Sequence, residues 1–381
     1  MSKIVYLANY NASRPERNAS PAGTTVMEYL IGCLEDIGKK TVVVSSSYSS
    51  KKLPREEVDI SECAKVILLK TEKKPPKTSL LRRYFRRRKH QKALFKELLN
   101  QLQDGDILLV YHSLALMRLV EKIRKKRNIT LILQVCEVYA DVVGDKKIRE
   151  KEFSFFSCAD KYIFQTEILN QLINRNKLPY VVLHGTYKNT IQPQKIHDFK
   201  WDYSKIHCVY AGTLDTRKGG AIAAVTAASF LPAEFHIHIL GFGTQKEIEQ
   251  IKTAISENSK INRATVSYDG CLQGEAYFQF LANCHVGLST QFTSGAFNAT
   301  SFPSKILSYM ANGLRVVTVR VPAIETSLVS DDLYYCENGT PESIAEAIKN
   351  IDFSQNYDGT GKIETLNKTF CTNLDSLLKK D

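Results

Sequence analysis

Short apolar runs alternate with amphipathic stretches along most of the 381-residue chain. Seven runs in the first half and six in the second are nearly continuously apolar, as in strands covered on both faces of a parallel sheet. They lie at residues 3–9, 41–47, 64–70, 106–112, 130–137, 161–166 and 180–185, and at residues 207–212, 236–241, 264–270, 285–290, 314–319 and 333–337. The pattern predicts an α/β protein with two doubly wound parallel-sheet domains, residues 1–187 and 206–350. A polar linker at residues 188–205 and a helical C-terminal segment at residues 351–381 complete the prediction.

Composition narrows the class of protein. The nine cysteines are scattered, without a C-x-x-C pair or a His/Cys cluster at zinc spacing, which predicts neither a disulfide framework nor a structural metal. The N-terminus lacks the apolar core of a signal peptide, and the longest apolar run, near residues 107–117, is interrupted by His112 and is too short to span a bilayer. We therefore expect a cytoplasmic protein.

Positive charge gathers in one segment of the chain. Of the net charge of +12, an excess of ten lies in residues 51–99, where sixteen Lys/Arg face six Asp/Glu. Residues 80–99 combine these cations with apolar side chains, as an interfacial helix on an anionic leaflet does. The alternative is a solvated helix that packs its apolar side on the sheet. Nucleic-acid binding is disfavoured because no recognition motif accompanies the charge. The apolar residues are Leu80, Leu81, Tyr84, Phe85, Leu94, Phe95, Leu98 and Leu99.

Ligands of doubly wound sheets bind at the carboxyl ends of strands, where loops lead into helix N-termini. After the first strand, a long polar loop leads to Gly23 and Thr24, which open an amphipathic helix that stops at Gly38. Pro21 and Gly23 would let backbone amides approach a ligand closely, although a glycine at such a place also serves as a plain turn.

The first loop of the second half carries a clearer signal. In "CVYAGTLDTRKGG", Gly212 and Thr213 end a strand, and the adjacent cations Arg217 and Lys218 follow. Cations at this place can neutralise a diphosphate that departs with negative charge, or they form a solvated pair in a loop.

Two stretches of the second half resemble a known family. "GTLDTRKG" looks like the G-R-L-x-x-x-K-G loop of the group-one, family-four type glycosyltransferases of GT-B fold. "FPSKILSYMANGLRVVT" resembles their F-P-S-K-x-x-E-Y-M-A-x-G-x-P-V-V segment. The similarity extends over most of residues 206–350, whereas the N-terminal half resembles the family mainly in strand order.

The resemblance implies two Rossmann-like domains that face a cleft. The second domain would hold most of the nucleotide sugar, for which a UDP sugar is expected, and the first would hold most of the acceptor. It also implies that residues 351–381 cross back to the N-terminal domain. By position, Lys218 would contact the donor diphosphate and Gly23 the phosphates from across the cleft. Gly241, Tyr268 and Leu272 would surround the base. The "SFPSK" backbone at a helix N-terminus would face the diphosphate or the sugar. The other donor-binding residues are Thr24, Gly212, Thr213, Arg217, Asn298, Thr300, Phe302, Pro303, Ser304, Lys305 and Ser308.

The chain departs from the family pattern at three charged positions. The family's phosphate-binding arginine falls at Thr213, and its paired glutamates, eight positions apart, fall at Thr300 and Ser308. Arg217 and Lys305 can supply cationic groups instead. Three hypotheses stay open: an active transferase with an altered donor pocket, a non-catalytic homologue that acts as a partner subunit, and a sugar-nucleotide epimerase of the same fold.

The resemblance implies a retaining reaction, in which the leaving phosphate takes the acceptor proton while Lys218 steadies its charge. An inverting reaction would need a base, for which His112, Glu137 and His184 are candidates at strand ends. Glu137 is favoured because a carboxylate directly after an apolar strand must face a polar cleft, and His184 is placed with the acceptor. A metal is not expected, since enzymes of this fold use cationic side chains and helix dipoles. His236 and His238 alternate along a strand and are expected to be packed rather than ligating.

These observations predict a metal-independent hexosyltransferase without a cofactor beyond its nucleotide sugar. The expected acceptor is a glycan or a polyprenyl-linked glycan in bacterial surface polysaccharide or glycoconjugate synthesis. We expect the enzyme to rest on the inner face of the cell membrane through residues 80–99 and to bind no nucleic acid.

Overall fold

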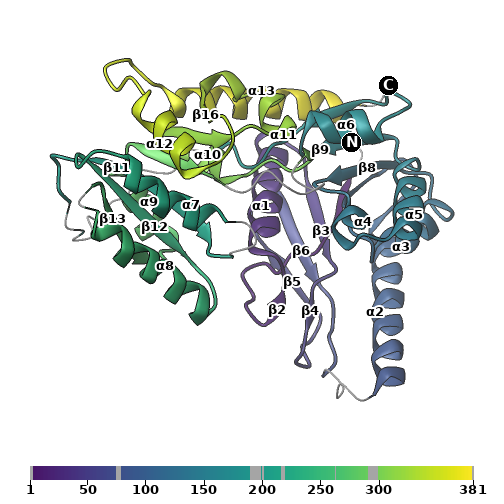
Figure 1. Ribbon diagram of the computed structural model, residues 1–381. Coiled ribbons are helices and arrows are strands. Elements are labelled where there is room, and N and C mark those ends of the chain that lie inside the picture. Colours follow the sequence, from purple (N-terminus) through teal and green to yellow (C-terminus); the bar gives the residue numbers. More distant parts are fainter. Residues whose placement is uncertain are drawn as a thin grey trace. The chain divides into compact units, whose positions relative to one another are not determined.

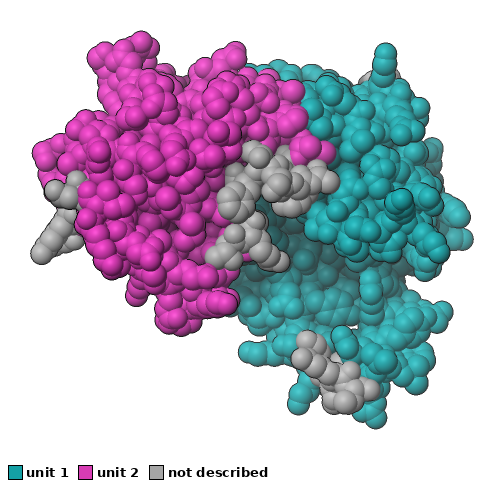
Figure 2. All heavy atoms as spheres, viewed as in Figure 1, with its two compact units in different colours: residues 1–186, 368–381 teal, residues 187–367 magenta. Residues whose placement is uncertain are grey.

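The computed structural model describes residues 3–73, 79–188, 199, 201–215, 219–261, 263–290 and 299–379. The chain forms two compact units, coloured separately in Figure 2. Unit 1 comprises residues 1–186 and 368–381, and unit 2 comprises residues 187–367. Each unit contains a largely parallel sheet with helices packed on it (Figure 1), so the protein belongs to the predicted α/β class.

Unit 1 is built on an eight-stranded sheet of order β10-β9-β8-β7-β1-β3-β6-β5. The chain starts in the middle at β1, proceeds outward on one side to β3 and β6, and then continues from β7 to β10 on the other side. All neighbouring strands are parallel except β5, which runs antiparallel to β6. The order therefore reverses between β1 and β7. The strands are β1 Ile4–Ala8, β3 Thr41–Ser45, β5 Glu56–Asp59, β6 Ala64–Leu68, β7 Ile107–Tyr111, β8 Thr130–Val135, β9 Lys161–Phe164 and β10 Tyr180–Val182, with a separate pair β2 Arg17–Asn18 and β4 Tyr48–Ser49.

The apolar runs explain why this sheet forms. Every residue of β1 and of β3 is buried, as expected of strands that are covered on both faces. One face packs Leu7 and Val110 into a cluster with Leu94 and Leu98 of α2 and Val120 of α3. The helices of this unit are α1 Pro21–Asp36, α2 Leu80–Gln101, α3 Met117–Arg124, α4 Tyr139–Val143, α5 Lys146–Phe156 and α6 Glu167–Ile173.

The start of α1 differs slightly from the prediction. The helix begins at Pro21, two residues before Gly23, because Ser20 caps it and accepts a hydrogen bond from the Gly23 N–H at 3.4 Å. It ends at Asp36, and Gly38 follows with φ of +73°, a conformation that favours glycine.

The last helix, α13 Gly359–Leu378, ends in unit 1. Buried Lys161 donates hydrogen bonds to the carbonyls of Leu377 at 2.9 Å and Lys379 at 2.8 Å, so this lysine caps the C-terminal end of the helix. Asp375 pairs with Lys39 at 3.0 Å. These contacts hold residues 368–379 against unit 1.

Unit 2 has a six-stranded sheet of order β13-β12-β11-β14-β15-β16 with parallel neighbours throughout. Its order reverses between β11 and β14. The strands are β11 Ile206–Thr213, β12 Phe235–Phe242, β13 Thr265–Gly270, β14 Val286–Ser289, β15 Arg315–Val319 and β16 Leu333–Cys336. The helices are α7 Gly220–Ala227, α8 Gln245–Ser259, α9 Gly274–Ala282, α10 Lys305–Ala311, α11 Pro322–Glu325 and α12 Pro341–Lys349, with 3-10 turns at Ala228–Phe230 and Ser330–Asp332.

Each of the thirteen predicted strand runs contains a strand, which confirms the doubly wound prediction for both sheets. The edge strand β5 was missed because its sequence, EEVD, is mostly charged and lacks an apolar run. Of the predicted linker at residues 188–205, residues 189–198 and 200 lie outside the described part of the chain.

Candidate functional site

Unit 1 contains a pocket at the reversal point of its sheet. A cavity of about 600 Å³ opens where β1 and β7 end, and its walls also come from the loop after β8 and from α1 and α2. Ligands of doubly wound sheets bind at this point because neighbouring loops diverge there. The pocket brings together two predicted site residues, Gly23 and Glu137. Thr24, the next residue of α1, keeps its hydroxyl buried without a hydrogen-bond partner among the described residues.

One wall of the pocket is strongly basic. Arg83, Arg86 and Arg87 line it from α2, beside His90 and Tyr48. Arg86 donates to the Ser49 carbonyl and lies over the Tyr48 ring, 4.7 Å from its centroid. Arg83 and Arg87 are exposed and form no ion pair with any described residue. This wall can therefore receive an anionic group.

Glu137 also lines the pocket, two residues after β8. Its carboxylate is half-buried beside Tyr111 and Tyr139, which also line the pocket. The pKa of Tyr139 is raised, first by burial and then by the charge of Glu137. The pKa of Tyr111 is also raised, chiefly by the neighbouring Cys136 and by burial. Both phenols consequently stay protonated near neutral pH and can donate hydrogen bonds into the pocket.

His112 follows β7 and lies behind the pocket wall. Its side chain is 1% exposed, and Nε2 lies 2.7 Å from Oε1 of Glu152, which is fully buried. Glu152 also accepts the backbone N–H groups of Tyr139 at 3.0 Å and Ala140 at 2.8 Å. Because a carboxylate only accepts, Nε2 of His112 carries a hydrogen. Nδ1 is buried and has no hydrogen-bond partner among the described residues.

His184 does not join this pocket. It is 1% exposed and directs Nδ1 to the carbonyl of Gln165 at 2.9 Å, and burial lowers its pKa to about 4. His184 is not among the described residues that line the cavity. The structure gives His184 the surroundings of a packed core imidazole.

In unit 2, the predicted donor residues cluster at the reversal point between β11 and β14. Gly212 and Thr213 end β11, and Lys305 of α10 reaches the same place. Its Nζ would lie 3.1 Å from a Cβ built on Gly212 and is 4.0 Å from the centroid of the Tyr210 ring. Thr290, directly after β14, donates to the Gly220 carbonyl at the start of α7 at 2.9 Å. Lys305 therefore places a cation beside the loop that follows β11.

Helix α10, which carries the "FPSK" motif, is fixed to the sheet by Tyr309. The Tyr309 hydroxyl accepts the N–H of Ala211 at 2.8 Å, and its ring lies so close to Gly287 that a Cβ there would stand 2.3 Å from it. Only glycine therefore fits at position 287. Anchored in this way, Phe302 is buried, while Pro303 is half-buried and Ser304 exposed.

The two positions that lack glutamate have different surroundings. Ser308 is half-buried and hydrogen-bonds the hydroxyl of Tyr277, whose pKa is raised by burial. Thr300 is half-buried in the segment before α10. Three further predicted residues, Arg217, Lys218 and Asn298, lie outside the described residues.

The predicted base-binding residues lie together at the ends of β12 and β13. The Tyr268 hydroxyl donates to the Gly241 carbonyl at 3.0 Å, and a Cβ on Gly241 would stand 2.0 Å from the Gly212 oxygen. Glycine is thus required for β11 and β12 to approach each other here. Leu272 is half-buried shortly after β13.

The structure corrects half of the interfacial-helix prediction. Leu94 and Leu98 are fully buried in the core of unit 1, and Phe95 and Leu99 pack against that core. These four residues cannot enter a membrane surface, since the sheet already covers them. Leu80, Leu81, Tyr84 and Phe85 remain exposed, by 74, 68, 56 and 55% respectively, on the N-terminal turns of α2, which project from the unit in Figure 1.

Sequence reasoning missed several residues at this site. Glu152 was overlooked, although its spacing from Phe155 and Phe156 places it on the apolar side of α5, where a carboxylate needs partners. The arginines of α2 were noted only as surface charge.

No described helix is both long and apolar enough to cross a membrane.

The sequence of the second unit matches a known protein family. Residues 205–351 match the model of the family described as Glycosyl transferases group 1. This match makes unit 2 similar to a group 1 glycosyltransferase domain. No curated protein sequence matches it significantly.

Solved structures resemble the whole chain. A sucrose-phosphate synthase from Thermosynechococcus elongatus is 14% identical with a TM-score of 0.65, over 99% of this chain and 95% of that one. A trehalose-6-phosphate protein from E. coli, described as bound with UDP-2-fluoro glucose, is 12% identical with a TM-score of 0.64 over 100% of both chains. A UDP-forming alpha,alpha-trehalose-phosphate synthase from Burkholderia xenovorans in complex with glucose-6-phosphate is 10% identical, with a TM-score of 0.64 over 99% of this chain and 100% of that one. At these identities the similarity establishes the fold.

Proposed function

We propose that the protein transfers a hexose from a UDP-linked donor bound by unit 2 to an acceptor bound in the pocket of unit 1. The observation that carries this proposal is the pocket itself. It lies at the reversal point of its sheet, and its lining combines a carboxylate, Glu137, with three arginines of α2. Two of the similar solved structures are described as bound with UDP-2-fluoro glucose and as a complex with glucose-6-phosphate.

For the donor, we propose that Lys218 and Lys305 supply the positive charge that steadies the departing UDP. Lys305 already stands beside Gly212, where the loop after β11 begins. The other donor residues proposed from the family pattern are Gly23, Thr24, Thr213, Arg217, Gly241, Tyr268, Leu272, Asn298, Thr300, Phe302, Pro303, Ser304 and Ser308. In this proposal Arg217 and Lys305 supply cationic groups, Asn298, Thr300 and Ser304 hydrogen-bond the sugar, and no metal ion is required for transfer.

For the acceptor, the basic wall favours a molecule with a phosphate group. Arg83 and Arg87 are exposed towards solvent and lie about one helical turn apart on α2, so both guanidinium groups can engage one phosphate or diphosphate. A polyprenyl-linked glycan carries such a group. The exposed Leu80, Leu81, Tyr84 and Phe85 on the same helix would then rest on the membrane that holds the lipid. We therefore propose a role in surface polysaccharide or glycoconjugate synthesis.

For the reaction, we propose retention, with the leaving phosphate as the base for the acceptor hydroxyl. Glu137 and the two phenols beside it would position that hydroxyl. The buried pair of His112 and Glu152 would hold the loop after β8 in place, because Glu152 accepts the backbone N–H groups of Tyr139 and Ala140.

The test combines donor binding with turnover. Purified protein is titrated calorimetrically with UDP, GDP, dTDP and CMP and with their sugars, and release of nucleotide is followed with lipid extract as acceptor. We expect UDP to bind, and Lys218→Met to weaken binding at least tenfold. Lys252→Met, at an exposed position in α8, is the matched control and should bind as the wild type does.

Two outcomes would contradict the proposal. If no nucleotide binds, the protein is a non-catalytic homologue. If a UDP sugar changes into its epimer without any acceptor, the reaction is an epimerisation. The anomeric configuration of a transfer product, read by NMR, decides between retention and inversion.

A further inference from the structure

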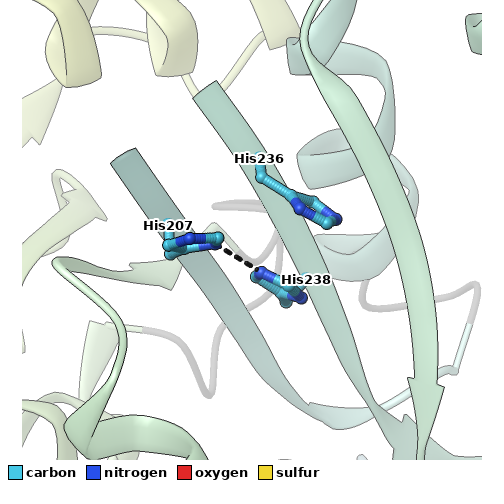
Figure 3. Close-up of side chains that lie close together, drawn as sticks. All are labelled: His207, His236 and His238. Carbon is cyan, nitrogen blue, oxygen red and sulfur yellow. Dashed lines mark hydrogen bonds between the residues drawn. The ribbon is translucent and has the colours of Figure 1, made fainter. Parts of the chain in front are cut away.

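Three imidazoles gather in unit 2, near the beginning of the neighbouring strands β11 and β12 (Figure 3). His207 is the second residue of β11 and stands in register with His236 of β12, and His238 follows on the same side of β12. One ring nitrogen from each lies within 4.8 Å of the others. The cluster lies at the amino ends of these strands, whereas the candidate donor residues Gly212 and Thr213 lie at the carboxyl end of β11.

Hydrogen bonds to outer partners determine which nitrogens carry hydrogen. Nε2 of His207 lies 3.0 Å from the Asp202 carbonyl, which can only accept, so Nε2 carries the hydrogen and Nδ1 presents a lone pair. Nδ1 of His238 lies 3.1 Å from Oδ2 of Asp269, a carboxylate that also only accepts. In the neutral ring of His238, Nε2 then presents its lone pair as well.

These two lone pairs face each other. Nδ1 of His207 and Nε2 of His238 are 2.9 Å apart, a distance at which two acceptors repel unless a cation lies between them (Figure 3). The Ser267 oxygen lies 2.8 Å from the same Asp269 oxygen, 3.1 Å from Nδ1 of His238 and 2.9 Å from Nε2 of His236, so its hydroxyl belongs to the same polar cluster. Trp201 packs on both rings, with centroids 4.7 Å from His207 and 5.1 Å from His238, so the pair is enclosed by apolar surface.

We propose that His207, His236 and His238 bind one divalent transition-metal ion, with Zn²⁺ as the best fit. Zn–N bonds of about 2.0–2.1 Å in a tetrahedral site separate two ligand nitrogens by roughly 3.4 Å. Nδ1 of His207 and Nε2 of His238 are closer than this, at 2.9 Å, and the three ligand nitrogens all lie within 4.8 Å of one another. Side-chain rotations would bring the nitrogens to the separation that the metal needs. A fourth position is left for water or an anion.

The outer partners have the chemistry that metal-bound histidines require. A ligating imidazole donates its other N–H to a carbonyl or carboxylate, which fixes the tautomer and the ring orientation. The Asp202 carbonyl does this for His207, and the Asp269 carboxylate does it for His238. Two of the three ligands are thus oriented in advance. The expectation that His236 and His238 are merely packed did not include His207, which strand pairing brings beside them.

The proposed metal has a structural role, and the site does not depend on the transferase proposal. It would join β11 to β12, the two strands that carry Gly212 and Gly241 at their other ends. Metal binding should therefore raise the melting temperature of the protein, since a ligand that binds the native state alone stabilises it.

The chain offers a direct optical probe. Trp201 is the single tryptophan and lies against two of the three rings. The full chain, free of any affinity tag and treated with a chelator, is titrated with CoCl₂. Trp fluorescence should be quenched in a saturable manner that ends at one equivalent. ZnCl₂ should reverse the quenching and raise the melting temperature by several degrees.

The variants give the matched comparison. His236→Gln, at the half-buried position, should weaken Co²⁺ quenching at least tenfold, whereas His90→Gln in unit 1 should leave it unchanged. Absence of saturable one-equivalent quenching in the wild type would overturn the proposal and indicate a proton shared between His207 and His238. Unchanged quenching in His236→Gln would also overturn it. The wild-type titration decides the matter even if a variant fails to fold.

Discussion

At the scale of single residues, unit 1 buries ionisable groups only with defined partners. Glu152 is fully buried, and its two oxygens accept one imidazole N–H and two backbone N–H groups. His184 is equally buried, and its Nδ1 lies 2.9 Å from the carbonyl of Gln165. Burial lowers the pKa of His184 to about 4, so its ring is neutral near neutral pH.

Replacing Glu152 tests how much the buried pair of His112 and Glu152 stabilises the protein. Glu152→Gln keeps the shape of the side chain but removes the charge that holds His112 and the loop after β8. Breaking a buried pair typically costs about 3 kcal/mol, so the free energy of unfolding should fall by about that amount, and turnover should fall with it. Chemical denaturation measures the loss. Glu150→Gln, at an exposed position of the same helix, should change stability by less than about 0.5 kcal/mol.

The buried imidazoles predict an acid-sensitive stability. Burial lowers the pKa of His184 and of His90 to about 4, below the ordinary value of about 6.5 for a histidine in an unfolded chain. Between pH 6.5 and 4 the unfolded state therefore binds protons that the native state does not, and stability falls as the pH falls through this window. Each group can contribute about 3 kcal/mol. His184→Asn, which keeps a donor for the Gln165 carbonyl, should flatten the dependence measured by denaturation at pH 7, 6, 5 and 4. An equally steep curve in this variant would contradict the assignment.

At the scale of elements, the two halves of α2 have different surroundings. Its second half contributes Leu94 and Leu98 to the core, while its first turns expose Leu80, Leu81 and nearby arginines. Hydrophobic periodicity alone could not separate these halves, because both contain apolar residues at similar spacing. Where the sheet ends beneath the helix is a property of the tertiary fold.

A pair of leucine substitutions distinguishes the two halves. Leu98→Ala should lower the free energy of unfolding by about 2–5 kcal/mol, because it leaves a cavity in the core. Leu80→Ala should leave stability within about 0.5 kcal/mol but reduce binding to vesicles that contain anionic lipid, measured by co-sedimentation. Equal vesicle binding by the wild type and Leu80→Ala would argue against the interfacial role of these turns.

The strands were predictable from sequence, whereas the sites were predictable only in part. Continuous apolar runs located β1, β3 and β11 because parallel strands are buried on both faces. Glu137 could be placed in a pocket because a carboxylate after such a strand must meet polar surroundings. The register of β11 against β12, which brings His207 to His236, depends on pairing between segments about thirty residues apart, and no local pattern encodes it.

At the scale of the whole molecule, each unit has its candidate site at the point where the strand order of its own sheet reverses. In unit 1 this point lies between β1 and β7, and in unit 2 between β11 and β14. The two sites also differ in chemistry, since the first combines arginines with a carboxylate and the second has glycines beside a lysine. Under the proposed function, each unit would recognise its own substrate.

Independent recognition predicts that donor and acceptor binding can be impaired separately. Arg83→Gln combined with Arg87→Gln should raise KM for a phosphate-bearing acceptor at least tenfold, because two charge-assisted contacts are lost. The Kd for UDP, measured by calorimetry, should stay within twofold of the wild type. Lys305→Met should have the opposite effect, weakening UDP binding while the acceptor KM changes little. If the arginine substitutions weaken UDP binding as strongly as Lys305→Met does, the basic wall belongs to the donor and the acceptor must bind elsewhere.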